Sequence, residues 1–189
     1  MPQKQRFVVF ALCAFVSLFA SDRAFSAFEV FGKAAYSKTY NNPDSYSETL
    51  SGAAGLGIYL FPQLRIEGRY TVIGNFQNQI ASAGVNDLLQ KTNIYSVSLD
   101  WDIVSEKYPV RPYLLLGAGY IETFREYTVE GLEFKDETQD FSLNAGAGIR
   151  IRIGRSLAFE VEAFGYMANP DKAERLINVY GNVGLRFFI

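Results

Sequence analysis

The chain has 189 residues, of which 15% are aromatic and 16 are glycine; it contains one cysteine and no histidine, and its formal net charge is −2. Because no imidazole is present to activate a nucleophile or bind a metal, the composition excludes the commonest hydrolytic and zinc chemistries. A nearly neutral charge also argues against nucleic-acid binding, which requires clustered Lys and Arg side chains. We therefore expect one domain with no cofactor, no metal centre and no nucleic-acid partner.

The first 27 residues predict a cleavable secretory signal peptide. Lys4 and Arg6 precede an apolar run over residues 7–20, which is shorter than the roughly 20 residues that a membrane-spanning helix needs. Small residues at 26 and 27 offer cleavage positions, although they do not fix the boundary, and a retained N-terminal anchor is the alternative. The sole cysteine, Cys13, lies inside the apolar run. The domain over residues 28–189 would then lack cysteine and carry a net charge of about −4, since cleavage removes three basic residues and one acidic residue.

The rest of the chain contains eight segments in which apolar and polar residues alternate. Alternation with period two is the pattern of a strand with one apolar face. The segments are 28–38, 46–60, 64–75, 91–103, 111–125, 138–153, 157–167 and 175–189. An even number of strands places both termini on one side of a membrane, and closure removes the unpaired edges. The sequence therefore predicts an all-β fold, an eight-stranded antiparallel up-and-down transmembrane β-barrel.

The connections between these segments alternate in length. The first, third and remaining odd connections are generally longer and polar, whereas the even ones are short turns at residues 61–63, 104–110 and 154–156. Short turns of outer-membrane barrels face the periplasm, and longer loops face the outside of the cell. We therefore expect four extracellular loops, over residues 39–45, 76–90, 126–137 and 168–174, and periplasmic termini.

If the apolar residues of each strand face lipid, the charged residues face the lumen. The residues assigned to this interior charge network are Arg65, Glu67, Arg69, Asp100, Asp102, Arg150, Arg152, Glu160, Glu162 and Arg186, with Glu29, Lys33 and Glu122 as further candidates. Acids and bases meet across neighbouring strands in this arrangement. An eight-stranded barrel is just wide enough to be filled by side chains, and unpaired buried charge is costly. We expect a salt-bridge network that plugs the lumen; a narrow ion path is the alternative.

Two features of the sequence bear on the assignment of the interior residues. Leu114, Leu115 and Leu116 are apolar on both faces, so the phase of the fifth strand stays open. The carboxylates Glu160 and Glu162 have the residue type that acid–base catalysis needs, but arginines beside them are the simpler explanation. No catalytic residue is assigned.

Two segments resemble a known family. Asn182, Gly184, Phe187 and Ile189 resemble the terminal signal by which the barrel-assembly machinery recognises its substrates, with Ile in place of the usual final Phe. Residues 111–120 resemble the fifth strand of OmpA/OmpX-like and opacity-protein barrels. The resemblance implies a bacterial outer-membrane location, contact with outer-membrane lipid and lipopolysaccharide, and delivery by periplasmic chaperones to that machinery. Outer-membrane barrel enzymes use a histidine in or beside the catalytic set, which this chain lacks.

The sequence thus predicts a non-enzymatic outer-membrane barrel with a structural or surface-interaction role, in which the loops could contact host or bacterial surfaces. A narrow porin or ion channel is the first alternative. A secreted lipocalin-like ligand carrier is the second, but it would place apolar residues inside the barrel. Such carriers also have a Gly-x-Trp near the first strand, whereas the single tryptophan here is Trp101 in the fourth.

Overall fold

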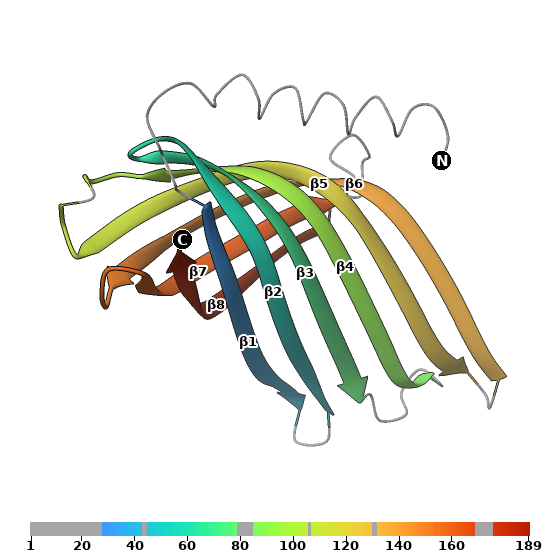
Figure 1. Ribbon diagram of the computed structural model, residues 1–189. Coiled ribbons are helices and arrows are strands. Elements are labelled where there is room, and N and C mark those ends of the chain that lie inside the picture. The colour runs from blue at the N-terminus through green and yellow to red at the C-terminus, as the bar shows by residue number, and fades with distance from the viewer. Residues whose placement is uncertain (1–27, 43–44, 79–84, 106, 130–131, 169–175) are drawn as a thin grey trace, which may run out of the picture.

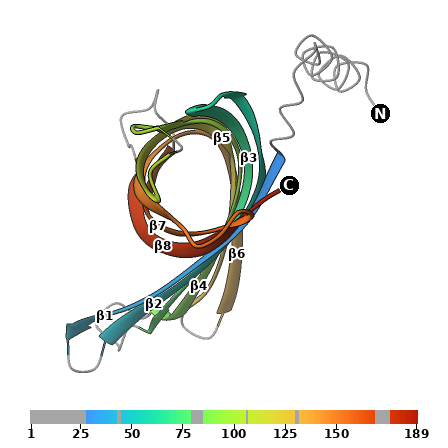
Figure 2. The same ribbon diagram turned by 60° about the vertical axis from the view of Figure 1, so that its left-hand side comes forward.

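The computed structural model describes residues 28–42, 45–78, 85–105, 107–129, 132–168 and 176–189, which form a closed barrel of eight antiparallel strands (Figures 1 and 2). The strands are β1 (Phe28–Asn42), β2 (Ser45–Phe61), β3 (Leu64–Asn78), β4 (Val85–Asp102), β5 (Val110–Val129), β6 (Leu132–Arg152), β7 (Leu157–Ala168) and β8 (Leu176–Phe188). Each strand pairs with its neighbours in sequence, and β8 pairs with β1. The predicted fold class is confirmed. The expected signal peptide, residues 1–27, lies outside the described residues.

Apolar side chains face outward and polar ones inward. Along β4 and the residue that follows it, the five side chains at odd positions from Tyr95 to Ile103 are between 46% and 60% exposed, whereas Ser96, Ser98, Asp100 and Asp102 are buried. On β8, Val183, Leu185 and Phe187 are likewise exposed. This is the reverse of a barrel that carries an apolar ligand inside. Among the described residues, no helix is long and apolar enough to cross a bilayer.

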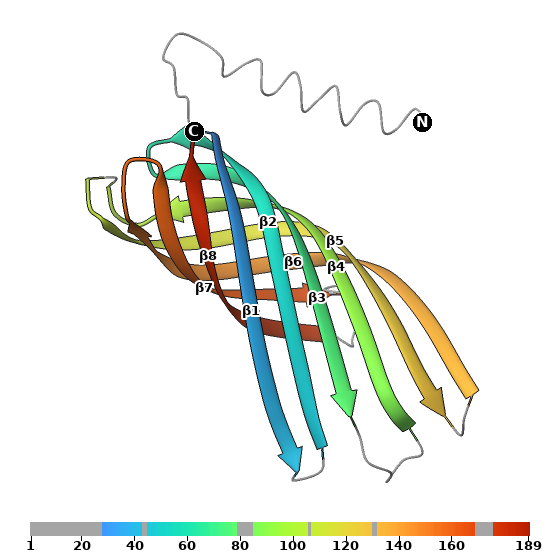
Figure 3. The ribbon, with the colours of Figure 1, turned by 60° about the horizontal axis from the view of Figure 1, so that its bottom comes forward.

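Six of the strands continue beyond the closed part of the barrel (Figures 1 and 3). In the described residues, β8 pairs with β1 only from Glu29 to Ala34, and β7 pairs with β6 only from Ser142 to Arg152. Strands β1 to β6 extend past these points as an open, curved sheet. We call it the projecting sheet; its two edges are residues 35–42 of β1 and residues 132–141 of β6.

Three of the four predicted loops are largely strand. Within the described residues, 39–45, 76–90 and 126–137 belong mostly to strands, because β1 runs to Asn42, β4 begins at Val85 and β6 begins at Leu132. The fourth predicted loop, 168–174, lies outside the described residues except for its first residue. The side chains of residues 134–139 are all exposed, whichever face they occupy. A strand surrounded by water on both faces has no apolar face, so the alternation that identifies the membrane segments is missing there.

Glycines on the inner wall allow large side chains to lie flat against the strands. A Cβ atom at Gly148 would lie 2.7 Å from the ring of Tyr113 and 2.5 Å from the carbonyl oxygen of Val161. Tyr113 is only 1% exposed, so its ring covers the backbone of the neighbouring strand at this point. At Gly181, on the outer face of β8, an added Cβ would meet nothing within 4 Å.

These two glycines give a matched pair of substitutions. Gly148→Val should lower the free energy of unfolding by about 1–3 kcal/mol, because the added methyl groups overlap the Tyr113 ring and force the inner wall to shift. Gly181→Val should leave the stability unchanged or raise it, since valine suits an exposed strand position. Urea unfolding in detergent micelles measures both. Equal effects of the two substitutions would contradict the packing of Tyr113 against Gly148.

Candidate functional site

Among the described residues, the barrel interior contains twelve buried charged side chains, which we call the charge cluster. Six are acidic and six are basic: Glu29, Glu67, Asp100, Asp102, Glu160 and Glu162, with Lys33, Arg65, Arg69, Arg111, Arg150 and Arg186. They come from every strand except β2, and they lie in the half of the barrel that contains the short turns, the start of β1 and the end of β8. The buried formal charge therefore sums to zero. An equal number of opposite charges permits each to be paired, which buried charges require.

Arg186 lies at the centre of the charge cluster. Its Nη2 is 2.7 Å from Glu67 Oε2, its Nε is 2.6 Å from Glu160 Oε1, and its Nη1 donates to Glu29. All four side chains are fully buried. One guanidinium thus joins carboxylates from β1, β3 and β7, using the planar fork of donors that suits several carboxylates at once.

Asp102 forms ion pairs with three arginines at the end of the barrel that contains the short turns. Arg111 Nη1 is 3.0 Å from Asp102 Oδ2, Arg65 Nη2 is 3.2 Å from Oδ1, and Arg150 also donates to Oδ1. The carboxylate of Asp100, two residues earlier on the same strand, forms an ion pair with Arg65 Nη2 at 2.7 Å and accepts a hydrogen bond from Arg150 Nη2 at 3.2 Å. These two acids of β4 therefore neutralise bases from β3, β5 and β6.

Glu162 is the second point of convergence. It accepts hydrogen bonds from Arg69 Nη1 at 2.7 Å, from Lys33 Nζ at 2.6 Å and from the Tyr113 hydroxyl at 2.9 Å. Lys33 also lies 3.0 Å from Glu160, so it bridges the two carboxylates of β7. Both carboxylates are therefore paired with buried cations.

Aromatic rings separate the guanidinium groups. Arg186 lies 4.6 Å from the ring centre of Phe31, Arg69 lies 4.6 Å from that of Phe164, and Arg150 lies 4.5 Å from that of Tyr113. Each distance is within the range of a cation–π contact. The rings fill the space that the ion pairs leave and add attraction for the cations.

The structure brings together nearly all the charged residues that the sequence assigned to the interior, but only some of their contacts join neighbouring strands as expected. The neighbouring-strand pairs Arg65 with Asp100 and Arg150 with Glu160 are present, the latter at 2.5 Å. Arg69, however, contacts Glu162 of β7 rather than an acid of β4. Many contacts cross the lumen between strands that are not neighbours, which alternation along single strands could not indicate.

Two assignments to the interior are wrong. Arg152 is exposed, because β6 ends at this residue and its side chain donates to the carbonyl oxygens of Gly154 and Arg155 in the following turn. Glu122 lies between the buried residues Ile121 and Thr123 and so points to the outer side of β5. Its inward assignment depended on the unresolved phase of that strand.

The same unresolved phase hid two interior residues, Arg111 and Tyr113. Both are almost fully buried, at 2% and 1% exposed, and both bond to acids of the charge cluster. The alternation of Arg111 and Tyr113 with Pro112 and Leu114 indicated that the two residues share one face. The three consecutive leucines, however, left open which face of β5 is the inner one.

The four residues that resemble an assembly signal lie on both faces of β8. Asn182 is inside, where its amide oxygen accepts from Ser51 at 3.3 Å, whereas Phe187 and Ile189 are 49% and 71% exposed on the outside. A Cβ atom at Gly184 would lie 2.3 Å from the carbonyl oxygen of Gly32. Glycine at this position therefore permits β8 to approach β1 where the barrel closes.

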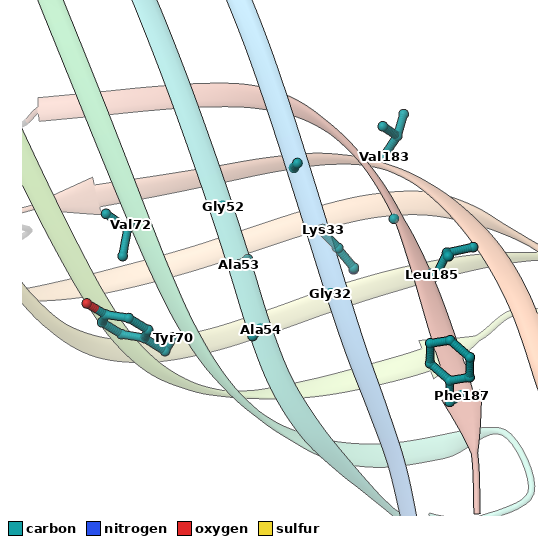
Figure 4. A pocket seen from close by; sticks show the side chains of 12 residues that line it. Gly32, Lys33, Gly52, Ala53, Ala54, Tyr70, Val72, Val183, Leu185 and Phe187 are labelled. Atoms are coloured by element: carbon teal, nitrogen blue, oxygen red, sulfur yellow. The ribbon is translucent and has the colours of Figure 1, made fainter.

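The outer wall carries an apolar groove over β8, β1, β2 and β3 (Figure 4). Small residues in register form its floor: Gly32, Ala34, Gly52 and Ala54. Larger residues of the flanking strands form its sides: Tyr70 and Val72 on β3, with Val183, Leu185 and Phe187 on β8. The lining is almost wholly apolar, as a surface in contact with hydrocarbon requires.

Among the described residues, no group of three or more acidic or cysteine side chains is arranged to hold a metal ion. The buried carboxylates instead accept from arginine and lysine. Their arrangement suits structural stabilisation rather than ligand coordination.

An eight-stranded barrel with a charged interior, an apolar exterior and short turns at one end has the features of an outer-membrane protein. The family of outer membrane protein beta-barrel domains matches residues 8–187. The chain belongs to this family. It is therefore a transmembrane β-barrel of the bacterial outer membrane, as its resemblance to the OmpA/OmpX-like barrels implied.

Solved structures of this family share the fold. Neisserial surface protein A (NspA) is 16% identical, with a TM-score of 0.59, and the match covers 89% of this chain and all of NspA. The N-terminal barrel of OprF from Pseudomonas aeruginosa is 13% identical, with a TM-score of 0.55, over 87% of this chain and 98% of that barrel. No curated protein is similar enough to count as a match. At these identities the likeness concerns the fold alone.

Proposed function

We propose that this outer-membrane barrel is non-enzymatic and acts at the cell surface through the projecting sheet and the loops that follow it. The observation that carries the proposal is the projecting sheet itself. Within the described residues, no strand pairs with the outer side of residues 35–42 of β1 or residues 132–141 of β6. A strand edge that is not covered presents backbone donors and acceptors to another chain.

The side chains at these edges also suit contact with a partner. Tyr36 at the β1 edge is 63% exposed, and Phe134 at the β6 edge is 43% exposed. Exposed aromatic residues at a sheet edge provide apolar contact area, and aromatic residues are enriched in binding interfaces. We therefore assign surface recognition of a host or bacterial cell to this part of the molecule.

The interior of the barrel, in this proposal, is a plug rather than a site. Its charges balance, and the carboxylates Glu160 and Glu162 accept from several cations each. The chain contains no histidine that could activate a serine such as Ser142. These features favour a structural role over catalysis and over a narrow channel.

The orientation and the assembly route complete the proposal. Residues 1–27 would serve as a signal peptide that is removed on export, with the termini periplasmic and the projecting sheet outside the cell. Asn182, Gly184, Phe187 and Ile189 would be read by the barrel-assembly machinery after delivery by periplasmic chaperones. The apolar groove on the outer wall would lie against outer-membrane lipid or the acyl chains of lipopolysaccharide.

Shortening the projecting sheet tests this function. Arg125 of β5 and Asp136 of β6 are cross-strand partners, so replacing residues 126–135 by Asn-Gly would close the hairpin with a two-residue turn. Gram-negative cells that carry the shortened protein should attach to a host-cell monolayer, and to one another, several-fold less than cells that carry the full chain. Equal attachment at equal surface amounts would contradict the proposal.

A matched control keeps the hairpin length. Glu126 and Lys135 form an exposed ion pair at 2.8 Å, and exposed pairs contribute little to stability. Replacing both by alanine should preserve attachment if the sheet edge itself binds the partner.

A further inference from the structure

The edge of β6 in the projecting sheet is negatively charged. Among the described residues, no strand pairs with the outer side of residues 132–141, and β6 is the last strand on that side of the sheet (Figure 3). The side chains of residues 134–139 are all exposed. Residues 134–140 carry three carboxylates and one ammonium group: Asp136, Glu137, Asp140 and Lys135. A chain that approaches this edge therefore meets more acid than base.

Strand β5 adds to the negative charge beside this edge. Its residues opposite the edge contribute two carboxylates and one guanidinium group: Glu122, Glu126 and Arg125. The two strands together carry five acids and two bases here, which gives a net charge of −3. The acids lie on both faces of the sheet, because Asp136 and Asp140 share the inner face whereas Glu137 points to the outer one.

The edge of β1, on the other side of the projecting sheet, lacks this charge. Lys38 is the only charged residue among residues 35–42. The two edges therefore offer similar backbone donors and acceptors but different side-chain charge. A charged partner strand would distinguish between them.

The side chains of an added strand would lie directly opposite those of β6. In an antiparallel pair, opposite charges at facing positions attract, whereas like charges destabilise the pair. The acids of the edge occupy positions 136, 137 and 140. Because the partner runs in the opposite direction, its facing cations would stand at one position and then three and four residues later. The next position would face Lys135 and would carry no positive charge.

We propose that the β6 edge binds, by antiparallel strand addition, an extended segment whose Lys or Arg residues stand at this spacing. Backbone hydrogen bonds to residues 132–141 hold the segment. The three acids favour a basic strand and repel an acidic one, so they set the specificity. The inference rests on the proposed function, because it names the partner of one edge of the projecting sheet.

Binding of labelled heptapeptides to the full protein in phosphatidylcholine vesicles tests the proposal, because this lipid has no net charge. The cationic probe is Lys-Thr-Val-Lys-Lys-Thr-Val; the neutral and anionic probes carry Gln or Glu in place of each Lys. Fluorescence anisotropy measures the dissociation constants. The cationic probe should bind about tenfold tighter than the neutral one, because three facing pairs gain opposite charges. The anionic probe should bind more weakly than either.

Two controls separate strand addition from general attraction of positive charge. The cationic probe with N-methylated backbone amides keeps its charge but loses its backbone donors, so it should bind several-fold more weakly. Lys107→Gln together with Arg155→Gln makes the protein more negative at exposed positions in the short turns, at the other end of the barrel. This double variant should bind the cationic probe as the wild type does. Undiminished binding of the N-methylated probe would contradict strand addition.

Asp136→Asn, Glu137→Gln and Asp140→Asn together should make the cationic and neutral probes bind equally. Equal binding of these two probes by the wild type would overturn the charge selection, but it would leave strand addition, and with it the proposed function, standing. Failure of every probe to bind would contradict both. The wild-type series of probes decides the question even if the triple variant fails to fold.

Discussion

Glu160→Gln is expected to lower the free energy of unfolding by about 3–5 kcal/mol, the range found when one partner of a buried ion pair is removed. Glu160 lies 2.6 Å from Arg186, 2.5 Å from Arg150 and 3.0 Å from Lys33, and all four side chains are fully buried. The substitution leaves three buried cations with one carboxylate fewer between them. Urea unfolding of the refolded protein measures the loss.

A compensating substitution serves as the control. Lys33→Met removes one cation beside Glu160 and restores the balance of buried charge. The Glu160→Gln, Lys33→Met double variant should therefore be more stable than the two single losses added together, by about 0.5–3 kcal/mol. Unchanged unfolding of the Glu160→Gln protein would show that the charge cluster does not stabilise the barrel.

Leu99→Arg should impair insertion by about 2–4 kcal/mol, the cost of an arginine on the lipid face near the membrane midplane. Leu99 is 50% exposed on the outer side of β4, between Val97 and Trp101, which are also exposed. Heat-modifiable gel mobility after refolding into vesicles measures the folded, inserted fraction.

The same strand offers a matched control for that substitution. Leu89 lies on the same face of β4 and is 49% exposed, but in the part of the strand that belongs to the projecting sheet. Leu89→Arg should therefore insert like the wild type. If both variants insert normally, β4 does not present Leu99 to lipid.

The fold could be predicted from the sequence wherever one face of a strand meets lipid. In β4 the alternation over residues 95–103 identified both faces correctly, because hydrocarbon excludes polar side chains from the outer one. It was lost in two places for physical reasons. Residues 134–139 of β6 are exposed on both faces of the strand, and in β5 the three consecutive leucines fit either phase.

The residues of the charge cluster were easier to predict than their partners. Alternation placed Arg69 and Glu162 inside, but their contact at 2.7 Å crosses the lumen from β3 to β7. Such a contact depends on the tilt and closure of the barrel, which no single strand encodes. Alternation also placed Arg152 inside. Its side chain is instead exposed, because β6 ends at this residue.

Single-channel recording of the refolded domain in a planar bilayer tests the account most directly, with heat-modifiable gel mobility as the check on folding. The balanced, fully paired charges of the charge cluster predict a folded, inserted protein that passes no current. Steady, discrete conductance steps would contradict a closed lumen. Such steps would favour a channel through the barrel interior over a surface role of the projecting sheet.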